Sequence, residues 1–262
     1  MLIPKKLAAK LDKDKSLREA VDAAAVDFGP WLKHGTPPFF PDYTDHGIGH
    51  VEDVLATASS LISDEAWPEV TAADAATLIL ATLLHDCAMH LTEEGFDALV
   101  TGASHAERID GFGDADWPEL WKEFLFSVKR FDDRALVDLF GSPVPVRTPP
   151  ADKGLMTLND RLLIGEFLRR HHPRLAHEIA LRGVPGPPPD PALSKTPDPL
   201  SLSPRLDPKL ADLAGLVARS HGLSLRATFG YLDNFHRREY KGVHAVFLMA
   251  VLRVSDYMQI QA

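Results

Sequence analysis

The sequence contains a single cysteine, Cys87, among its 262 residues. One cysteine excludes a disulfide framework, and it also excludes a zinc module built on several thiolates. A reducing compartment, the cytoplasm, is the location that this composition favours. Because Cys87 follows an apolar run, we expect it to be a small buried residue.

Long apolar runs are also lacking. The N-terminal stretch MLIPKKLAAKLDKDKS has no apolar core of signal-peptide length. No uninterrupted run reaches the roughly 18 residues that a membrane-spanning helix needs. The sequence therefore predicts a soluble, intracellular protein that does not enter a membrane.

Positive charge is in deficit, with 28 Lys and Arg against 37 Asp and Glu and a formal net charge of −9. Binding to duplex nucleic acid needs clustered positive charge that displaces phosphate counterions, so a duplex partner is not expected. A nucleotide substrate is not excluded, because a bound metal or a local basic group can oppose the overall field.

Alternating strand patterns and repeats of 20–50 residues are absent as well, whereas helical periodicity recurs along the chain. We predict an all-α fold in one domain spanning residues 1–262. Thr71 with Asp74 resembles a capping box at the start of a central apolar helix. Three further signals predict helix ends: Gly29-Pro30, the residue before Pro173, and Gly222 as a C-cap.

Two segments interrupt this pattern. Residues 95–150 have an amphipathic stretch around Trp117 to Phe131 and a proline-rich exit, which predicts a helical insertion packed on the core. Residues 183–208 hold nine of the 21 prolines, which predicts a surface loop or linker.

Residues that commonly bind metals lie at predicted helix ends or on apolar helix faces. A charged Asp on an apolar face is unfavourable unless it is paired or coordinates a metal. Two such aspartates with four histidines therefore indicate a metal site. The six residues are His50, His85, Asp86, His172, His221 and Asp256.

Mixed imidazole and carboxylate ligands suit Mn, Fe, Co, Ni or Zn better than Ca or an all-oxygen Mg site. His85 and Asp86 are adjacent, so both reach one centre only if the helix ends or is distorted there. Alternatively, two metals share the ligands, with an Asp bridging them.

The order His50, His85-Asp86, Asp256 resembles the HD superfamily of metal-dependent phosphohydrolases, named for the His–Asp pair. VLRVSDYMQI is similar to the closing helix of that family. HPRLAHEIA resembles the HPxxGxxIL stretch of its dinuclear subgroup, which favours His172 over His171, and ARSHG supplies His221. The resemblance covers roughly residues 42–90 and 155–260 and implies an HD-type helical bundle.

YTDHGIGHVEDVL, FLRRHH and SHG look most like the HD domains of bacterial conflict effectors, which act in antiviral defence. Such domains can precede an ATPase domain, so this likeness implies a possible ATPase partner and a chain that is one module of a longer protein. The sequence departs from the family at Met89, where many dinuclear members carry a phosphate-binding lysine. It also lacks the Gly-Tyr-Pro signature of the members that act on cyclic dinucleotides.

The resemblance implies hydrolysis of a phosphomonoester or phosphodiester, with a nucleotide as the expected substrate and a metal-bound hydroxide as the nucleophile. Two divalent transition-metal ions are implied as cofactors: Mn, Fe, Ni or Co, with Mg or Zn as alternatives. Asp86 would be the bridging catalytic residue, with His50 and Asp256 on one metal, His172 and His221 on the other, and His85 on either.

Phosphate also needs cationic or donor contacts. Arg253, one turn before Asp256, and His46, four residues before His50, are the candidates for substrate binding. Arg169 and Arg170 form a second candidate patch.

Two other functions stay open. The same ligands can support a di-iron HD-type oxygenase, and an HD module can also be a ligand-sensing regulatory domain. The sequence does not specify the oligomeric state.

Overall fold

The computed structural model describes residues 1–33, 37–41, 47–104, 108–187, 200–203, 205–238 and 240–260. All regular structure among these residues is helical. No strand occurs among them, so the all-α prediction is confirmed. The α-helices are α1 (Lys5–Leu11), α2 (Lys15–Lys33), α3 (Ile48–Leu61), α4 (Ala72–Leu84), α5 (Glu93–Thr101), α6 (Trp117–Val128), α7 (Asp133–Phe140), α8 (Leu158–Arg182), α9 (Pro208–Ser220), α10 (Leu225–Asn234) and α11 (Ala245–Ile260). Short 3₁₀ helices are η1 (Trp67–Glu69), η2 (Cys87–His90), η3 (Lys153–Leu155) and η5 (Tyr240–Gly242).

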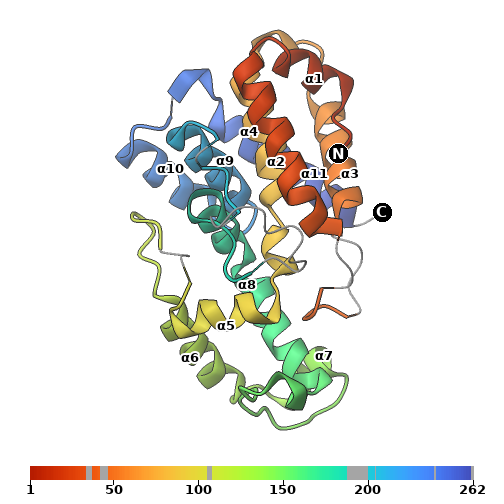
Figure 1. Ribbon diagram of the computed structural model, residues 1–262, viewed down its shortest axis with the longest axis vertical. Helices are drawn as coiled ribbons and strands as arrows, with labels where there is room; N and C mark the ends of the chain where they lie inside the picture. The colour runs from red at the N-terminus through yellow and green to blue at the C-terminus, as the bar shows by residue number, and fades with distance from the viewer. Residues whose placement is uncertain are drawn as a thin grey trace.

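Helix α4 is the central element of the bundle. It starts at the predicted capping box, in which Thr71 Oγ1 accepts from the Asp74 amide and the Asp74 carboxylate accepts from the Thr71 amide. Every residue from Ala73 to Leu84 is buried. Helices α1, α2, α9 and α11 pack around it (Figure 1), so its apolar run forms the core.

The segment that contains α4 is also the one candidate for a membrane-spanning helix among the described residues. By length and composition alone, Ala72–His90 qualifies as a helix that could cross a membrane, although it contains no uninterrupted apolar run of that length. Because 94% of that window is buried inside the molecule, it matches the core helix of a soluble protein.

Two helix pairs flank the end of α4. Helix α11 packs along α3, and α9 packs along α8. Helix α8 is long, and Figure 1 shows it running from the main bundle down to α5, α6 and α7. Helices α5 and α6 pack onto α8 through an aromatic cluster around Phe167 that includes Phe96, Trp117, Trp121 and Phe124. Residues 95–150 therefore contain packed helices, while the boundaries of that insertion stay a prediction.

Two predicted helix ends are wrong, and both involve proline. Helix α2 continues through Pro30 to Lys33, because Trp31 and Leu32 are buried in the core beyond it. Helix α8 continues through Pro173 to Arg182. In each case proline removes one helical hydrogen bond, and burial of the residues that follow offsets that loss.

The described ends of the proline-rich segment 183–208 pack on the core. Val184, Leu202 and Leu206 are buried, and the Leu202 amide donates to the Ala180 carbonyl. Pro208 is the first residue of α9, where its missing N–H leaves no helical bond unmade. The described ends thus combine buried residues with exposed ones such as Gly186 and Arg205, and the loop as a whole stays a prediction.

Candidate metal centre

Helix α4 ends at the His85–Asp86 pair. His85 is the C-cap, and Asp86 leaves the helix with φ −108° and ψ 2°. Nδ1 of His85 lies 2.7 Å from the Thr82 carbonyl oxygen, and because a carbonyl only accepts, Nδ1 donates. Nε2 of His85 is left facing the site. The helix therefore ends where two adjacent side chains need to reach one centre.

His172 is oriented by the proline that follows it. Pro173 has no N–H, so the Arg169 carbonyl lacks its usual helical partner. Nδ1 of His172 donates to that carbonyl at 2.7 Å. Its Nε2 lies 3.2 Å from Asp86 Oδ1 and 2.7 Å from His221 Nε2.

His221 is the C-cap of α9, and its Nδ1 donates to the Ala218 carbonyl. The turn that carries it is held from α11, where Arg253 Nη1 donates to the carbonyls of Ser220 at 3.0 Å and Leu223 at 2.7 Å. Three histidines of the site thus use a backbone carbonyl at a helix end, or one freed by proline, to fix the ring.

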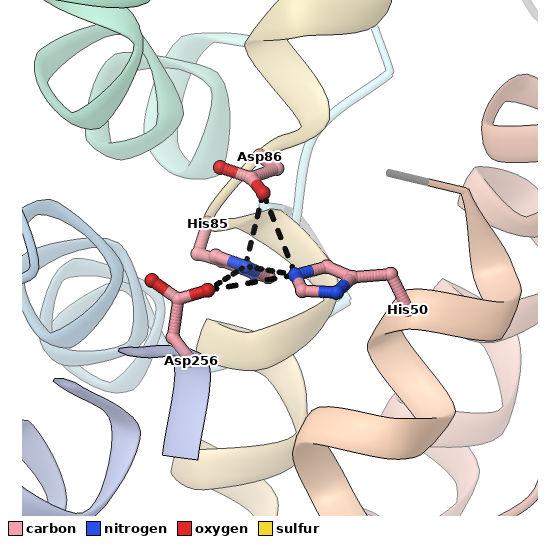
Figure 2. Close-up of side chains that lie close together, drawn as sticks. All are labelled: His50, His85, Asp86 and Asp256. Atoms are coloured by element: carbon pink, nitrogen blue, oxygen red, sulfur yellow. Dashed lines mark hydrogen bonds and ion pairs between the residues drawn. The ribbon is translucent and has the colours of Figure 1, made fainter. Parts of the chain in front are cut away.

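His50 and Asp256 face the pair from α3 and α11 (Figure 2). His50 Nε2 lies 3.3 Å from His85 Nε2 and 3.5 Å from Asp256 Oδ1. Oδ2 of Asp86 lies 3.2 Å from His85 Nε2 and 3.7 Å from His50 Nε2. Because α3 and α11 pack together, side chains about 200 residues apart in the sequence meet here.

The six predicted ligands form two groups that share Asp86. The four-residue group is His50, His85, Asp86 and Asp256, and the three-residue group is Asp86, His172 and His221. Within each group the donor atoms lie within 4.8 Å of one another. Ligand atoms at about 2.1 Å from one ion are about 3.0–3.4 Å apart in octahedral or tetrahedral geometry, close to most of the spacings here.

The donor set of the three-residue group fits a cation. In the form that binds metals, with only Nδ1 protonated, the rings of His172 and His221 each present a lone pair at Nε2, and two lone pairs 2.7 Å apart repel unless a cation or proton separates them. Burial lowers the pKa of His221 to about 4, and a positive charge on a neighbouring histidine would act in the same direction. His221 is therefore a neutral imidazole at pH 7, the form that binds metals.

The four-residue group also requires positive charge. Burial lowers the pKa of His85, but the carboxylates of Asp86 and Asp256 outweigh it and raise that pKa well above its ordinary value. Burial raises the pKa of Asp256, but hydrogen bonds from His50 and His85 outweigh it and lower that pKa. A divalent ion would supply the positive charge that a proton on His85 otherwise provides, so these residues fit a metal too.

The predicted substrate-binding residues are His46 and Arg253. His46 lies outside the described residues, so its role stays a prediction. Arg253 lies beside the site with Nη1 directed at the two backbone carbonyls near His221. Its contact with substrate also stays a prediction.

The other candidate residues near His172 make contacts outside the two ligand groups. His171 packs against Phe167 and Trp117, and burial lowers its pKa to about 4, so the choice of His172 agrees with the geometry. Arg169 and Arg170 both pair with Glu166. Cys87 and Met89 are buried, as predicted for the cysteine.

Several buried polar residues near the site were not predicted. His177 is fully buried, and its Nε2 lies 2.9 Å from Asp212 Oδ1. Arg174 and Arg219 are buried beside Asp114. The two arginines lie two residues from His172 and His221, which is a weak signal, and nothing in the sequence pattern singles out Asp114.

Comparison with known proteins identifies the family. The family model HD-CE matches residues 40–262, most of the chain. Neither the curated proteins nor the solved structures contain a match. The match covers the whole His/Asp cluster, which is consistent with an HD-type metal site. The chain belongs to the HD-CE family.

Proposed function

We propose that this protein is a metal-dependent phosphohydrolase that cleaves a phosphomonoester or phosphodiester bond, with a nucleotide as the substrate class. An HD-family domain with this cluster indicates a metal-dependent hydrolase in general. The observation that supports the dinuclear form is the position of Asp86, whose Oδ2 faces the four-residue group and whose Oδ1 faces the three-residue group.

His50, His85 and Asp256 would hold one ion, His172 and His221 the other, and Asp86 both. Ions bound there would lower the pKa of a coordinated water and neutralise charge on the phosphoryl oxygens. This assignment places His85 with His50 because its Nε2 lies 3.5 Å from Asp256 Oδ1. Mn, Fe, Ni and Co suit the ligands best, with Zn and Mg as alternatives.

The residues of the chain hold the donor atoms in position. Backbone carbonyls fix Nδ1 of three histidines, so each Nε2 is directed at the site before any ion arrives. The burial of His85 and Asp86 keeps the site away from bulk water, which strengthens its electrostatic interactions. We expect Arg253 and His46 to contact the phosphate.

The buried Met89 stands where dinuclear relatives carry lysine, so a lysine contact to phosphate is not expected at that position. Cyclic dinucleotides are a less favoured substrate than other nucleotides, because the sequence lacks the Gly-Tyr-Pro signature of the members that act on them. A role in antiviral defence beside an ATPase domain is part of the proposal, and it rests on the sequence resemblance alone.

The test is a phosphatase and phosphodiesterase screen on metal-free protein loaded separately with Mn, Ni, Mg or Fe. We expect phosphate release by the wild type, and a loss of at least about a thousandfold in Asp86→Ala, because both ions lose a ligand. Asp233→Ala, which removes an exposed ion pair with Arg238, is the control. Oxygen consumption by the iron form without phosphate release would instead favour the oxygenase, and full activity in Asp86→Ala would refute the proposal.

A further inference from the structure

A second cluster of buried charges lies behind the metal centre, where the segment before α6 meets α8 and α9. It consists of Asp114, Arg174 and Arg219, with Glu178 beside them. The side chains of Arg174 and Arg219 are 8% and 3% exposed, and that of Asp114 is 15% exposed. Buried charges need partners, so the contacts within this cluster affect the packing of both helices.

Asp114 is the carboxylate that both arginines contact. Nη2 of Arg219 donates to both of its carboxylate oxygens at 2.8 Å. Nε of Arg174 lies 3.7 Å from Asp114 Oδ2. Without that negative charge, two guanidinium groups on neighbouring helices would repel each other in a poorly solvated space.

Other contacts fix the arginines but leave them short of acceptors. Nε of Arg174 also donates to Glu178 at 2.7 Å, and its Nη1 donates to the Ala115 carbonyl at 2.8 Å. Among the described residues, Arg174 Nη2 and Arg219 Nε and Nη1 are buried without a hydrogen-bond partner. Losing Asp114 would add Nη2 of Arg219 to these unpaired donors, which is unfavourable in the interior.

The cluster lies close in the chain to two proposed ligands. Arg174 follows His172 by two residues on α8, and Arg219 precedes His221 by two on α9. The backbones of these helices approach closely, since a Cβ added at Gly222 would lie 2.4 Å from Pro173 Cγ. A change in the spacing of α8 and α9 would therefore change the 2.7 Å distance between the two Nε2 atoms.

We propose that Asp114 is a positioning residue for the three-residue group: by pairing with Arg174 and Arg219 it holds α8 and α9 at the spacing that lets His172 and His221 share an ion. This inference rests on the proposed metal site. Asp114 acts through the two arginines and touches neither the ion nor the substrate. Loss of Asp114 should therefore weaken the binding of the ion held by the three-residue group and leave the ion of the four-residue group bound.

The experiment compares the wild type with Asp114→Asn, which removes the charge but keeps the shape. Mn²⁺ is titrated into metal-free protein by calorimetry, and magnetic coupling between two bound ions is followed by electron paramagnetic resonance. Asp116→Asn is the matched control, because Asp116 lies in the same segment, is exposed and makes no side-chain cap bond. Near-ultraviolet circular dichroism checks that each variant is folded.

We expect two coupled ions in the wild type and in Asp116→Asn. In Asp114→Asn the first ion should bind as before, while the second should bind at least about tenfold more weakly and the coupled signal should be lost. Asp114→Glu, which restores the charge, should recover part of the affinity. If Asp114→Asn does not fold, Arg219→Gln tests the same pair from α9 with the same expected result.

Three results would overturn the inference. The first is Asp114→Asn binding both ions as tightly as the wild type, the second is an equal loss in Asp116→Asn, and the third is a wild type that binds one ion. A wild type that binds no divalent metal would refute the proposed function itself.

Discussion

Three of the four histidines in the candidate metal centre donate Nδ1–H to a backbone carbonyl three residues earlier: His85 to Thr82, His172 to Arg169 and His221 to Ala218. Two of these carbonyls belong to the last turn of a helix, where carbonyls lack the usual amide partner four residues on. The third is freed by Pro173 inside α8. The backbone therefore sets the tautomer of each ring and directs its Nε2 to the site.

Pro173→Ala tests this device at His172. Alanine restores an amide N–H that competes with His172 Nδ1 for the Arg169 carbonyl. We expect the second ion to bind about tenfold more weakly. The metal-free protein should be no less stable, because alanine is about 3 kcal/mol better than proline inside a helix. Metal titration and urea denaturation measure the two effects. Pro30→Ala in α2 is the control, and unchanged metal affinity in Pro173→Ala would contradict the role of the proline.

The proton on His85 predicts how metal binding depends on pH. In the metal-free protein Asp86 and Asp256 hold the pKa of His85 well above its ordinary value, so an ion must displace a proton from that ring. Apparent affinity should therefore rise with pH, by up to about tenfold per unit, until the pH exceeds that raised pKa. Calorimetry in buffers of different ionisation enthalpy counts the protons released. Constant affinity from about pH 6 to about pH 8 without proton release would count against this account of the site.

At the scale of the elements, the contact between α8 and α9 places two of the proposed ligands. Helix α9 ends at His221-Gly222 as predicted, but the C-cap is His221 and not Gly222. Gly222 is not in the left-handed conformation. Glycine is needed there because Pro173 packs against its backbone.

Gly222→Ala should push α9 away from α8, since the new Cβ would lie 2.4 Å from Pro173 Cγ. We expect a loss of about 1–3 kcal/mol in unfolding free energy and weaker binding of the second ion. Gly230→Ala in α10 is the control, because a Cβ there meets nothing within 4 Å and alanine favours the helix. Urea denaturation separates the two variants, and equal stability in both would show that the close contact is unimportant.

The helices and the site were predictable from the sequence to different degrees. The capping box at Thr71 and the apolar run that follows it are local signals, and both specified α4 correctly. The six ligand-type residues were singled out because they lie at predicted helix ends or on apolar helix faces, and the family resemblance then favoured His172 over His171. Helices α2 and α8 continue through Pro30 and Pro173 because the residues that follow are buried, and this burial depends on tertiary packing that local sequence signals do not reveal.

At the scale of the whole molecule, partners that lie far apart in the sequence were not predictable. Asp114 is 105 residues from Arg219, and His177 is 35 residues from Asp212. Neither pair has a fixed spacing, because helix packing alone brings its members together.

Glu178 should make the stability of the molecule depend on pH. Burial raises its pKa from 4.5 to about 7, although Arg174 and Trp117 donate hydrogen bonds to it. The folded protein thus binds more protons than the unfolded chain between these two values. The stabilisation is fully present below about pH 4.5 and is lost as the pH rises through about 7, an effect of about 3 kcal/mol.

Glu178→Gln should flatten this dependence between about pH 5 and about pH 8, because the amide does not titrate. Urea denaturation at both pH values measures it, with Glu123→Gln, an exposed carboxylate on α6, as the control. An unchanged difference between the two pH values in Glu178→Gln would rule out this residue as the cause.

The metal content of the purified protein tests the dinuclear site most directly. We expect about two divalent ions per chain in the wild type after equilibration with Mn²⁺ and removal of free metal, and fewer than one in Asp86→Ala, because Asp86 contributes an oxygen to both groups. A wild type without bound metal, or an Asp86→Ala variant with the metal content of the wild type, would contradict the proposed centre.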